Sequence, residues 1–339
     1  MHSYLTSIIV CGDSNFAIAV YSQGRDHMYR ARFAFIPIVI SIVILTSSSL
    51  LFAQTWISAS GSDTNSCTYA YPCRTLAGAL AKTSAGGRIN MIGSGEFGPG
   101  PVTITQAVTI DGGGGLASIL ASSSGANGIT VSAGASDIVI LRGLRIEGVY
   151  TGQTGVDFQS GGSLFVEDCS ISSFTVYGIS FEPNLSNQLF ISNTTIENIN
   201  PGSTSSAGIY FSATGKVKSA VTVNKTRVEG CGTGLLAKSA GLKALVSDSI
   251  ISGNTAHGIS VQGSSLVSTE RCILANNGKA GITVNSSGAT VIINNDTIVN
   301  SGYGLLYGSA GGSIISTKTN AITQNTNNTA VPSGTVALE

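Results

Sequence analysis

A hydrophobic phrase of about 25 residues repeats from Val139 almost to the C-terminus. In each copy, short β-branched segments alternate with polar positions and are interrupted by Gly, Asn or Ser every few residues. Such alternation is typical of β-strands, whereas helix-pair repeats need a period of about 33 residues or more. We therefore expect one coil of a β-solenoid for each copy. The clearest copies are Leu164–Ser173, Leu189–Asn198, Val221–Gly230 and Val291–Asn300.

One apolar residue of each copy, which we call the anchor, is used to count the period. We expect the anchor to end the first strand of its coil. The spacings between successive anchors are similar except for the one from Ile196 to Val228, so this coil is longer than the others. Because neighbouring strands lie about 4.8 Å apart, equivalent residues of successive coils should stack in columns. The anchors are Ile146, Ile171, Ile196, Val228, Ile251, Leu274, Ile298 and Ile322.

Three further columns follow from this alignment. The column five places before the anchor is mostly apolar and runs from Leu141 to Thr317. The column two places before the anchor is short and mostly polar, which predicts a tight inward turn. A third column contains Phe158, Phe181 and Phe211, which we expect to form an aromatic stack in the interior.

The chain resembles the right-handed parallel β-helix proteins of the pectin-lyase-like superfamily over roughly residues 56–330. The resemblance rests on the coil length, on the x-I-x-x-N…G-I-x-V phrase, and on an opening that comprises Trp56–Asn65, Cys67…Cys73-Arg74-Thr75-Leu76 and Val102–Gly114. It implies an all-β fold, a right-handed parallel β-helix solenoid with coils of about 25 residues. It also implies a link to carbohydrates, since these proteins are mostly secreted polysaccharide lyases, hydrolases, esterases, epimerases and phage tailspikes.

A short helix is expected to cap the N-terminal end of the solenoid. In Thr75–Ala81, Leu76, Ala79 and Leu80 would lie on one helical face. Terminal coils of a solenoid need such a cover because nothing else stacks on them. The segment therefore predicts a short N-terminal capping helix.

The chain ahead of the solenoid has the pattern of an export signal. An apolar run, Phe33–Leu45, follows Arg30 and Arg32 and precedes the small residue Ala53. This order of basic, apolar and small residues predicts a secretory signal peptide at residues 28–53. We expect a secreted, periplasmic or cell-surface protein that has no membrane contact after signal cleavage.

Two other interpretations concern the same region. Residues 1–27 precede Met28 and are interpreted as a gene-model extension. Phe33–Ala53 is just long enough to span a bilayer, so an uncleaved membrane anchor is the alternative to a signal peptide. The expected organisation after it is an N-terminal cap with the first coil at residues 54–100, the parallel β-helix at 101–330 and a C-terminal tail at 331–339.

Export also bears on the cysteines. Cys67 and Cys73 close a small loop beside Pro72, and in an oxidising compartment they are expected to form a disulfide that pins the N-terminal cap. Cys169 and Cys272 share a column but lie four coils apart, or about 19 Å. They cannot be bridged over that distance.

Charge and histidine content exclude several classes of function. Residues 1–53 hold three basic and two acidic side chains, which leaves the rest of the chain with a net charge of −1 and no basic cluster. Such a chain does not fit nucleic acid binding. His257 is the one histidine after residue 53, so a zinc or copper site built on histidines is not expected. We interpret His257 as a solvent-facing turn residue.

One charged patch is the candidate for chemistry. Glu197 and Glu229 fall on adjacent coils, one place after the anchor, and Arg227 lies on the strand of Glu229. A carboxylate can transfer a proton and an arginine can neutralise a sugar acid, so these three are the candidate catalytic residues. The extra segments of the long coil, Asn200–Ser206 and Ala213–Ala220, are expected to wall a groove beside this patch.

Three more charged residues are candidates for substrate binding. Lys225, Asp248 and Arg271 occupy consecutive coils, three places before the anchor. The alternative for the whole patch is a ladder of alternating charges that keeps an exposed sheet face soluble and in register.

Three functions stay open at this point. The first is a secreted carbohydrate-interacting protein without a recognisable catalytic constellation, since neither G-x-S-x-G nor a P-loop nor the signatures of the enzymatic relatives occur. The second is a polysaccharide lyase or glycoside hydrolase that acts on acidic polysaccharide, the one case in which calcium would be expected as a cofactor. The third is a structural or adhesive surface protein. A polysaccharide or other glycan is the expected partner.

Overall fold

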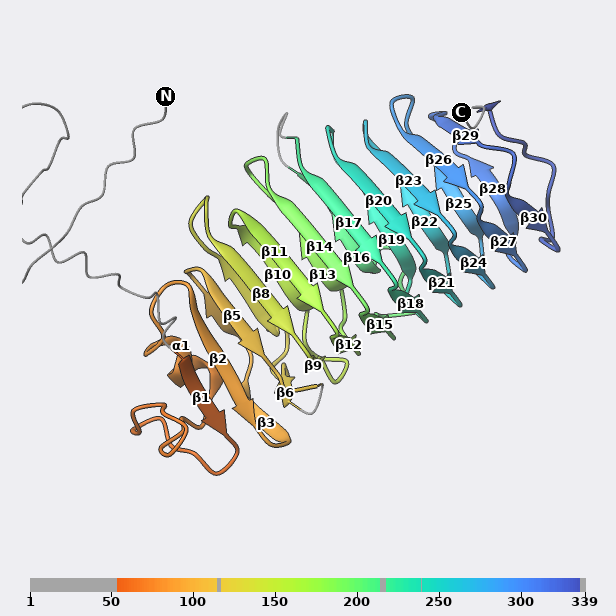
Figure 1. Cartoon of the computed structure of the whole chain (residues 1–339). Coiled ribbons are helices and arrows are strands. Elements are labelled where there is room, and N and C mark those ends of the chain that lie inside the picture. Colours follow the sequence, from red (N-terminus) through yellow and green to blue (C-terminus); the bar gives the residue numbers. More distant parts are fainter. Residues whose placement is uncertain (1–53, 115–116, 214–217, 239, 336–339) are drawn as a thin grey trace, which may run out of the picture. The chain divides into compact units, whose positions relative to one another are not determined.

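The computed structural model describes residues 54–335 apart from 115–116, 214–217 and 239. These residues form a parallel β-solenoid of three sheets, named A, B and C here (Figure 1). Each coil of the repeat region adds one strand to each sheet in the order A, B, C. The all-β parallel solenoid predicted from the sequence is therefore confirmed.

The expected signal peptide at 28–53, the extension at 1–27 and the alternative anchor at Phe33–Ala53 lie outside the described residues, and so do the last four residues of the chain. No helix of the described ranges has both the length and the hydropathy that a membrane span requires.

Sheet A has twelve strands, and its sequence order shows that each coil stacks on the previous one. Its strands alternate buried and exposed positions, as Leu189–Ser192 does with two buried aliphatic residues, so one face of the sheet packs inward. The strands are β1 (Gln54–Ser58), β2 (Gly87–Ile92), β5 (Val108–Asp111), β8 (Ile138–Arg142), β11 (Ser163–Glu167), β14 (Gln188–Ser192), β17 (Ala220–Asn224), β20 (Lys243–Ser247), β23 (Leu266–Glu270), β26 (Thr290–Asn294), β29 (Ser313–Ser316) and β31 (Gly334–Thr335).

Sheet B has ten short strands and contains the anchors. Every anchor from Ile146 to Ile322 pairs with the next one along the sheet, which confirms the predicted column. The strands are β3 (Gly95–Pro99), β6 (Ala117–Leu120), β9 (Leu144–Glu147), β12 (Ser170–Ser172), β15 (Thr195–Glu197), β18 (Arg227–Glu229), β21 (Ile250–Ser252), β24 (Ile273–Ala275), β27 (Thr297–Val299) and β30 (Ala321–Thr323).

The position of the anchor within its coil was predicted wrongly. It lies inside the second strand of the coil, not at the end of the first, because a residue with positive φ separates the two strands. That residue is Lys225 (φ 48°), Asp248 (φ 50°) or Arg271 (φ 54°) in successive coils. Such a left-handed conformation turns the chain within a few residues, so one continuous phrase becomes two strands. The last coil also departs from the alignment, since Ile293 pairs with Ser316 and not with Thr317.

Sheet C has nine strands, and its inner face carries the predicted aromatic stack. Phe158, Phe181 and Phe211 are fully buried, and successive ring centroids lie 4.9 Å and 6.5 Å apart. The strands are β4 (Val102–Ile104), β7 (Ile129–Ser132), β10 (Thr154–Ser160), β13 (Tyr177–Phe181), β16 (Ala207–Phe211), β19 (Thr233–Ala237), β22 (His257–Val261), β25 (Ala280–Val284) and β28 (Tyr303–Tyr307).

The short polar column two places before the anchor lies inside the solenoid, as predicted. Its side chains accept hydrogen bonds from the backbone of the preceding coil: the Thr226 amide donates to Ser249 Oγ (3.1 Å) and the Cys272 amide to Asp296 Oδ1 (2.8 Å). These bonds satisfy amides that the turn between sheets A and B would otherwise leave unpaired. Burial raises the pKa of the Asp296 carboxyl above its ordinary value.

The N-terminal cap combines a helix and a disulfide. Helix α1 (Leu76–Leu80) begins after Thr75, whose hydroxyl accepts from the Gly78 amide (3.0 Å), and it buries Leu76 and Ala79. The expected disulfide between Cys67 and Cys73 is present. Cys169, Cys231 and Cys272 are free and buried.

Candidate functional site

The two predicted catalytic carboxylates are neighbours in register on β15 and β18, as expected for Glu197 and Glu229. Arg227 donates from Nε to Glu229 Oε2 (2.7 Å), and the Ser252 hydroxyl donates to Glu229 Oε1 (2.6 Å). Both oxygens of Glu229 are therefore engaged.

The three predicted substrate-binding residues lie at the corner between sheets A and B. Arg271 makes a bidentate pair with Asp248, Nε to Oδ1 at 2.7 Å and Nη2 to Oδ2 at 3.0 Å. The hydrogen bond from Arg271 lowers the pKa of the Asp248 carboxyl, and Lys225 adds to this effect through its charge. The Arg271 and Asp248 side chains are 47% and 32% exposed, so the pair belongs to the surface.

The charged patch thus contains two partly exposed ion pairs, Arg227–Glu229 and Arg271–Asp248, along sheet B and its corner. Neither of the two surface hollows described below is lined by Glu197, Glu229 or Arg227. This geometry favours the ladder interpretation over a catalytic one.

A different group of side chains surrounds a hollow of about 320 Å³ on the outer face of sheet C. The lining side chains come from β19, β22, β25 and β28, from residues directly before or after these strands, and from the long coil. Two of them, Lys238 and Lys279, are cationic, and none is a carboxylate. Among the described residues, no acid lies within ion-pair distance of either lysine. The lining residues are Thr204, Ser205, Thr233, Leu236, Lys238, His257, Ser260, Gln262, Lys279, Thr283, Asn285, Leu306 and Gly308.

His257 lies in this hollow, which corrects its interpretation as a solvent-facing turn residue. It is the first residue of β22 and is half-buried, because the coil turns directly into the sheet C strand at this point. Burial and, to a smaller extent, the charge of Lys279 lower the pKa of the imidazole to about 4. Its Nδ1 atom is buried and has no hydrogen-bond partner among the described residues. At neutral pH the ring is therefore uncharged.

A platform of two stacked tyrosines adjoins the hollow. The rings of Tyr177 and Tyr210 are parallel, with an interplanar angle of 1° and centroids 4.2 Å apart. Lys238, which lines the hollow, places Nζ 5.9 Å from the centroid of the Tyr210 ring. Burial raises the pKa of the Tyr177 phenol to about 12, so the group stays protonated at neutral pH.

The insertion in the long coil walls this hollow and not the carboxylate patch. Thr204 and Ser205 line the hollow, and Thr255 Oγ1 donates to Pro201 O (2.7 Å), which ties the insertion to a coil 54 residues later. The segment was expected to wall a groove beside the carboxylates, but it lies in the turn between β15 and β16, and its residues Thr204 and Ser205 line the hollow of sheet C instead. The second segment, Ala213–Ala220, lies partly outside the described residues.

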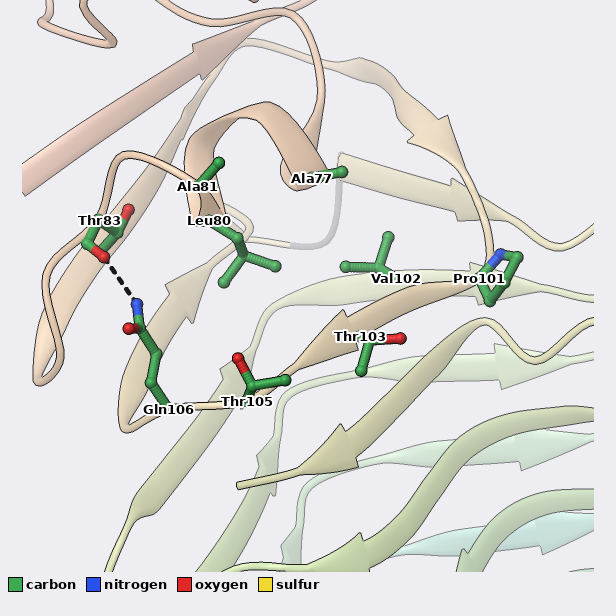
Figure 2. Close-up of a pocket in the computed structure, with 9 residues that line it drawn as sticks. All are labelled: Ala77, Leu80, Ala81, Thr83, Pro101, Val102, Thr103, Thr105 and Gln106. Atoms are coloured by element: carbon green, nitrogen blue, oxygen red, sulfur yellow. Dashed lines mark hydrogen bonds between the residues drawn. The ribbon is translucent and has the colours of Figure 1, made fainter. Parts of the chain in front are cut away.

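A second hollow, of about 420 Å³, separates helix α1 from β4 at the start of sheet C. Figure 2 shows Leu80 of the helix and Val102 of the strand facing this space, while Gln106 donates from Nε2 to Thr83 O (2.6 Å). No ionisable side chain lines it, so it offers no acid–base chemistry. The lining residues are Ala77, Leu80, Ala81, Thr83, Pro101, Val102, Thr103, Thr105 and Gln106.

In the part of the chain that the structure describes, no group of three or more His, Cys, Asp or Glu side chains is arranged to hold a metal ion. The chemistry of the sheet C hollow is that of two lysines, a neutral histidine, hydroxyls and amides.

Sequence reasoning missed Lys238, Lys279 and Tyr210. A signal for the first was present, since Lys238, Gln262 and Asn285 form one outward column directly after the predicted column of Ala237, Val261 and Val284. The stacking of Tyr177 on Tyr210 carried no such signal, because the two residues occupy different columns.

This fold and its three-sheet coil define a right-handed parallel β-helix protein. Residues 102–242 and 203–327, which together span more than half of the chain, match the family described as "Right handed beta helix region", and the chain belongs to that family. No curated protein sequence matches the chain.

Two solved structures illustrate the similarity. The alginate lyase from Paenibacillus sp. str. FPU-7 is 16% identical, with a TM-score of 0.64, over 80% of this chain and 96% of that one. The pectate lyase Pel9A is 14% identical, with a TM-score of 0.57, over 83% of this chain and 79% of that one. At these identities the similarity establishes the fold.

Proposed function

We propose that this protein binds an acidic polysaccharide along the outer face of sheet C. The observation that carries the proposal is the pair of cations, Lys238 and Lys279, that have no acidic partner among the described residues and line a walled hollow. Unpaired positive charge in a concave site attracts an anionic ligand, and the low-dielectric walls strengthen the attraction.

The side chains around the lysines suit a sugar polymer. In the stacked pair of Tyr177 and Tyr210, each half-buried ring has one face turned away from its partner, and such a face can stack on the apolar face of a sugar ring. Gln262 and Asn285 offer amide groups for sugar hydroxyls, and Thr204 and Ser205 offer hydroxyls from the wall. Lys238 lies between platform and hollow, where it would meet a sugar carboxylate beside the stacked ring.

The named relatives support a polysaccharide as the ligand class. The two solved structures are called an alginate lyase and a pectate lyase. A lyase or hydrolase that uses Glu197 and Glu229 is less well supported, because Glu229 already accepts hydrogen bonds from Arg227 and Ser252.

We also propose that the protein acts outside the cytoplasm. The Cys67–Cys73 disulfide supports this, since disulfides persist in oxidising compartments. Exported protein should begin at Gln54 or within about two residues of it, because a signal peptide is cleaved after a small residue and Ala53 is the small residue at this position. N-terminal sequencing that finds residues ahead of Phe33 in the exported protein would contradict the proposal.

The binding proposal is tested with polygalacturonate as the probe and two charge-matched double variants. Lys238→Ala/Lys279→Ala should weaken binding by about tenfold or more, because each lysine is expected to pair with a sugar carboxylate. Lys225→Ala/Lys243→Ala removes the same charge from exposed positions outside the hollow and should change binding by less than about twofold. Equal losses in the two double variants would show non-specific attraction and contradict the site. Release of unsaturated ends by the wild-type protein would point instead to a lyase.

A further inference from the structure

A loop at the N-terminal end of the solenoid displays two exposed tyrosines. Tyr69 and Tyr71 are 67% and 66% exposed, and they lie inside the ring closed by the Cys67–Cys73 disulfide. The loop is far from the sheet C hollow, since seven strand spacings along sheet A, or about 34 Å, separate β1 from β20.

The loop is held rigidly. The Tyr71 amide donates to Thr68 O (3.2 Å), which closes a turn with Tyr69 at its tip. The Trp56 amide donates to Cys67 O (2.8 Å) and the Cys73 amide to Trp56 O (2.9 Å), so both ends of the ring are bonded to strand β1. Rings presented by a fixed backbone lose little conformational entropy when they bind a ligand.

The polar groups that flank the loop are used to hold it in place. Asp63 accepts from the Arg74 and Thr75 amides (both 2.9 Å), and Asn65 Nδ2 donates to Pro72 O (2.8 Å). Neither tyrosine hydroxyl has a hydrogen-bond partner within the described ranges. The rings of Tyr69 and Trp56 form a T-shaped pair with centroids 5.0 Å apart, whereas the ring of Tyr71 has no aromatic neighbour among the described residues. Internal packing therefore does not account for Tyr71.

We propose that this aromatic loop, Cys67–Cys73, is a second glycan-binding site that stacks on uncharged sugar rings. An aromatic face carries partial negative charge and attracts the C–H groups on the apolar face of a sugar. Sugar hydroxyls can bond to the free phenols at the rim of the same contact. Because stacking of this kind needs no sugar carboxylate, the loop should accept neutral polysaccharides that the lysine-lined hollow does not select.

The size of the surface favours a sugar over a protein partner. Two tyrosine rings offer at most about 300–500 Å² of contact. A stable protein interface needs about 800 Å² from each partner. The loop is therefore large enough for one or two sugar rings and too small for a stable protein interface.

The experiment uses xyloglucan, a soluble neutral polysaccharide, in affinity electrophoresis and fluorescence titration. Trp56 is the single tryptophan of the chain and touches Tyr69, so its fluorescence reports on the loop. Wild-type protein should be retained by xyloglucan and should show a fluorescence change. Tyr69→Ala/Tyr71→Ala should weaken this binding by about tenfold or more, with an unchanged melting temperature.

Tyr150→Ala is the matched control, because Tyr150 is 61% exposed and lies outside the loop. It should bind xyloglucan as the wild type does. Xyloglucan binding that is absent in the wild type, or equal in the double tyrosine variant, would overturn the proposal. The proposal would also be overturned if the wild type bound phosphatidylcholine vesicles and not xyloglucan, and if the double tyrosine variant lost that vesicle binding. The lysine variants address the hollow separately, since Lys238→Ala/Lys279→Ala should keep xyloglucan binding while it loses polygalacturonate.

Discussion

The outer faces of sheets B and C carry charge in opposite ways. On sheet B and its corner, Glu229 pairs with Arg227 and Asp248 pairs with Arg271, and all four side chains are at least partly exposed. On sheet C, Lys238 and Lys279 have no acidic partner among the described residues and line a hollow with a wall. The first face holds more charge, but much of it is paired, whereas both cations of the sheet C hollow are free to act on a ligand.

This contrast shows why the density of charged residues is a weak guide to function in a stacked fold. Parallel coils place equivalent residues about 4.8 Å apart, so opposite charges on adjacent coils neutralise each other. Such pairs contribute little to stability and attract ligands weakly. A binding site needs both an uncompensated charge and a concave surface, and on sheet C the insertion near Thr204 contributes a wall of the hollow that the two lysines line.

The largest expected effect comes from making sheet C resemble sheet B. Gln262 is the neighbour of Lys238 in the outward column, so Gln262→Glu places a carboxylate beside that lysine with almost no change in shape. Compensation of the charge should weaken polygalacturonate binding by about tenfold, or about 1.4 kcal/mol. Isothermal titration calorimetry measures the change.

The control for this variant is Asn285→Gln, which keeps the next position of the column uncharged. It should bind polygalacturonate within about threefold of the wild type, as expected for the loss of a neutral hydrogen bond. If Gln262→Glu binds polygalacturonate as tightly as the wild type does, the charge of Lys238 does not contribute to binding. The proposed difference between the outer faces of sheets B and C would then be wrong.

A second expected effect concerns the protonation of His257. Its pKa of about 4 lies below the ordinary value, mainly through burial and secondarily through Lys279. Because the unfolded chain binds this proton more readily, the contribution of His257 to stability is complete above about pH 6.5 and is lost as the pH falls toward 4. Lys279→Ala should raise the pKa of His257, since it removes a positive neighbour.

Titration of the ring protons by NMR measures this pKa in both proteins. His257→Gln is the companion variant, and its unfolding free energy should fall less between pH 7 and pH 4.5 than that of the wild type. A titration midpoint for His257 near 6.5 would show that the hollow does not desolvate the residues that line it. The outer face of sheet C would then be an ordinary exposed face, like that of sheet B.

The smallest expected effects belong to the two carboxylates of sheet B, and they differ in sign. Glu229→Gln loses its ion pair with Arg227 and should destabilise the protein by about 0.2–1 kcal/mol. Glu197 has no cation within ion-pair distance in the described part of the chain and is the register neighbour of Glu229, so Glu197→Gln should be neutral or slightly stabilising. Urea melts of both variants measure the difference. A loss of polygalacturonate binding in either variant would show that the substituted carboxylate takes part in ligand binding.

The columns of the core followed from the sequence because stacking repeats the same side-chain requirement every coil. The pairing of Phe158, Phe181 and Phe211, and of every anchor, needed no information beyond the period. The two-strand division of the phrase did not follow, since Lys225 and Arg271 adopt positive φ although neither residue type signals it. Compensation within the patch was also inaccessible, because it depends on which rotamers bring Arg227 to Glu229 and Arg271 to Asp248.

By itself, the sequence determined the coil length, the inward and outward positions, the capping helix and the Cys67–Cys73 disulfide. Each of these depends on a local pattern or on the repeat. In a repeat, equivalent residues of successive copies can be aligned from the sequence alone. Only the tertiary structure decided that the insertion of the long coil folds over sheet C, where Thr255 holds it, and that His257 lines the resulting hollow. An insertion breaks the repeat, so its position depends on contacts between coils far apart in the chain, and no local pattern encodes them.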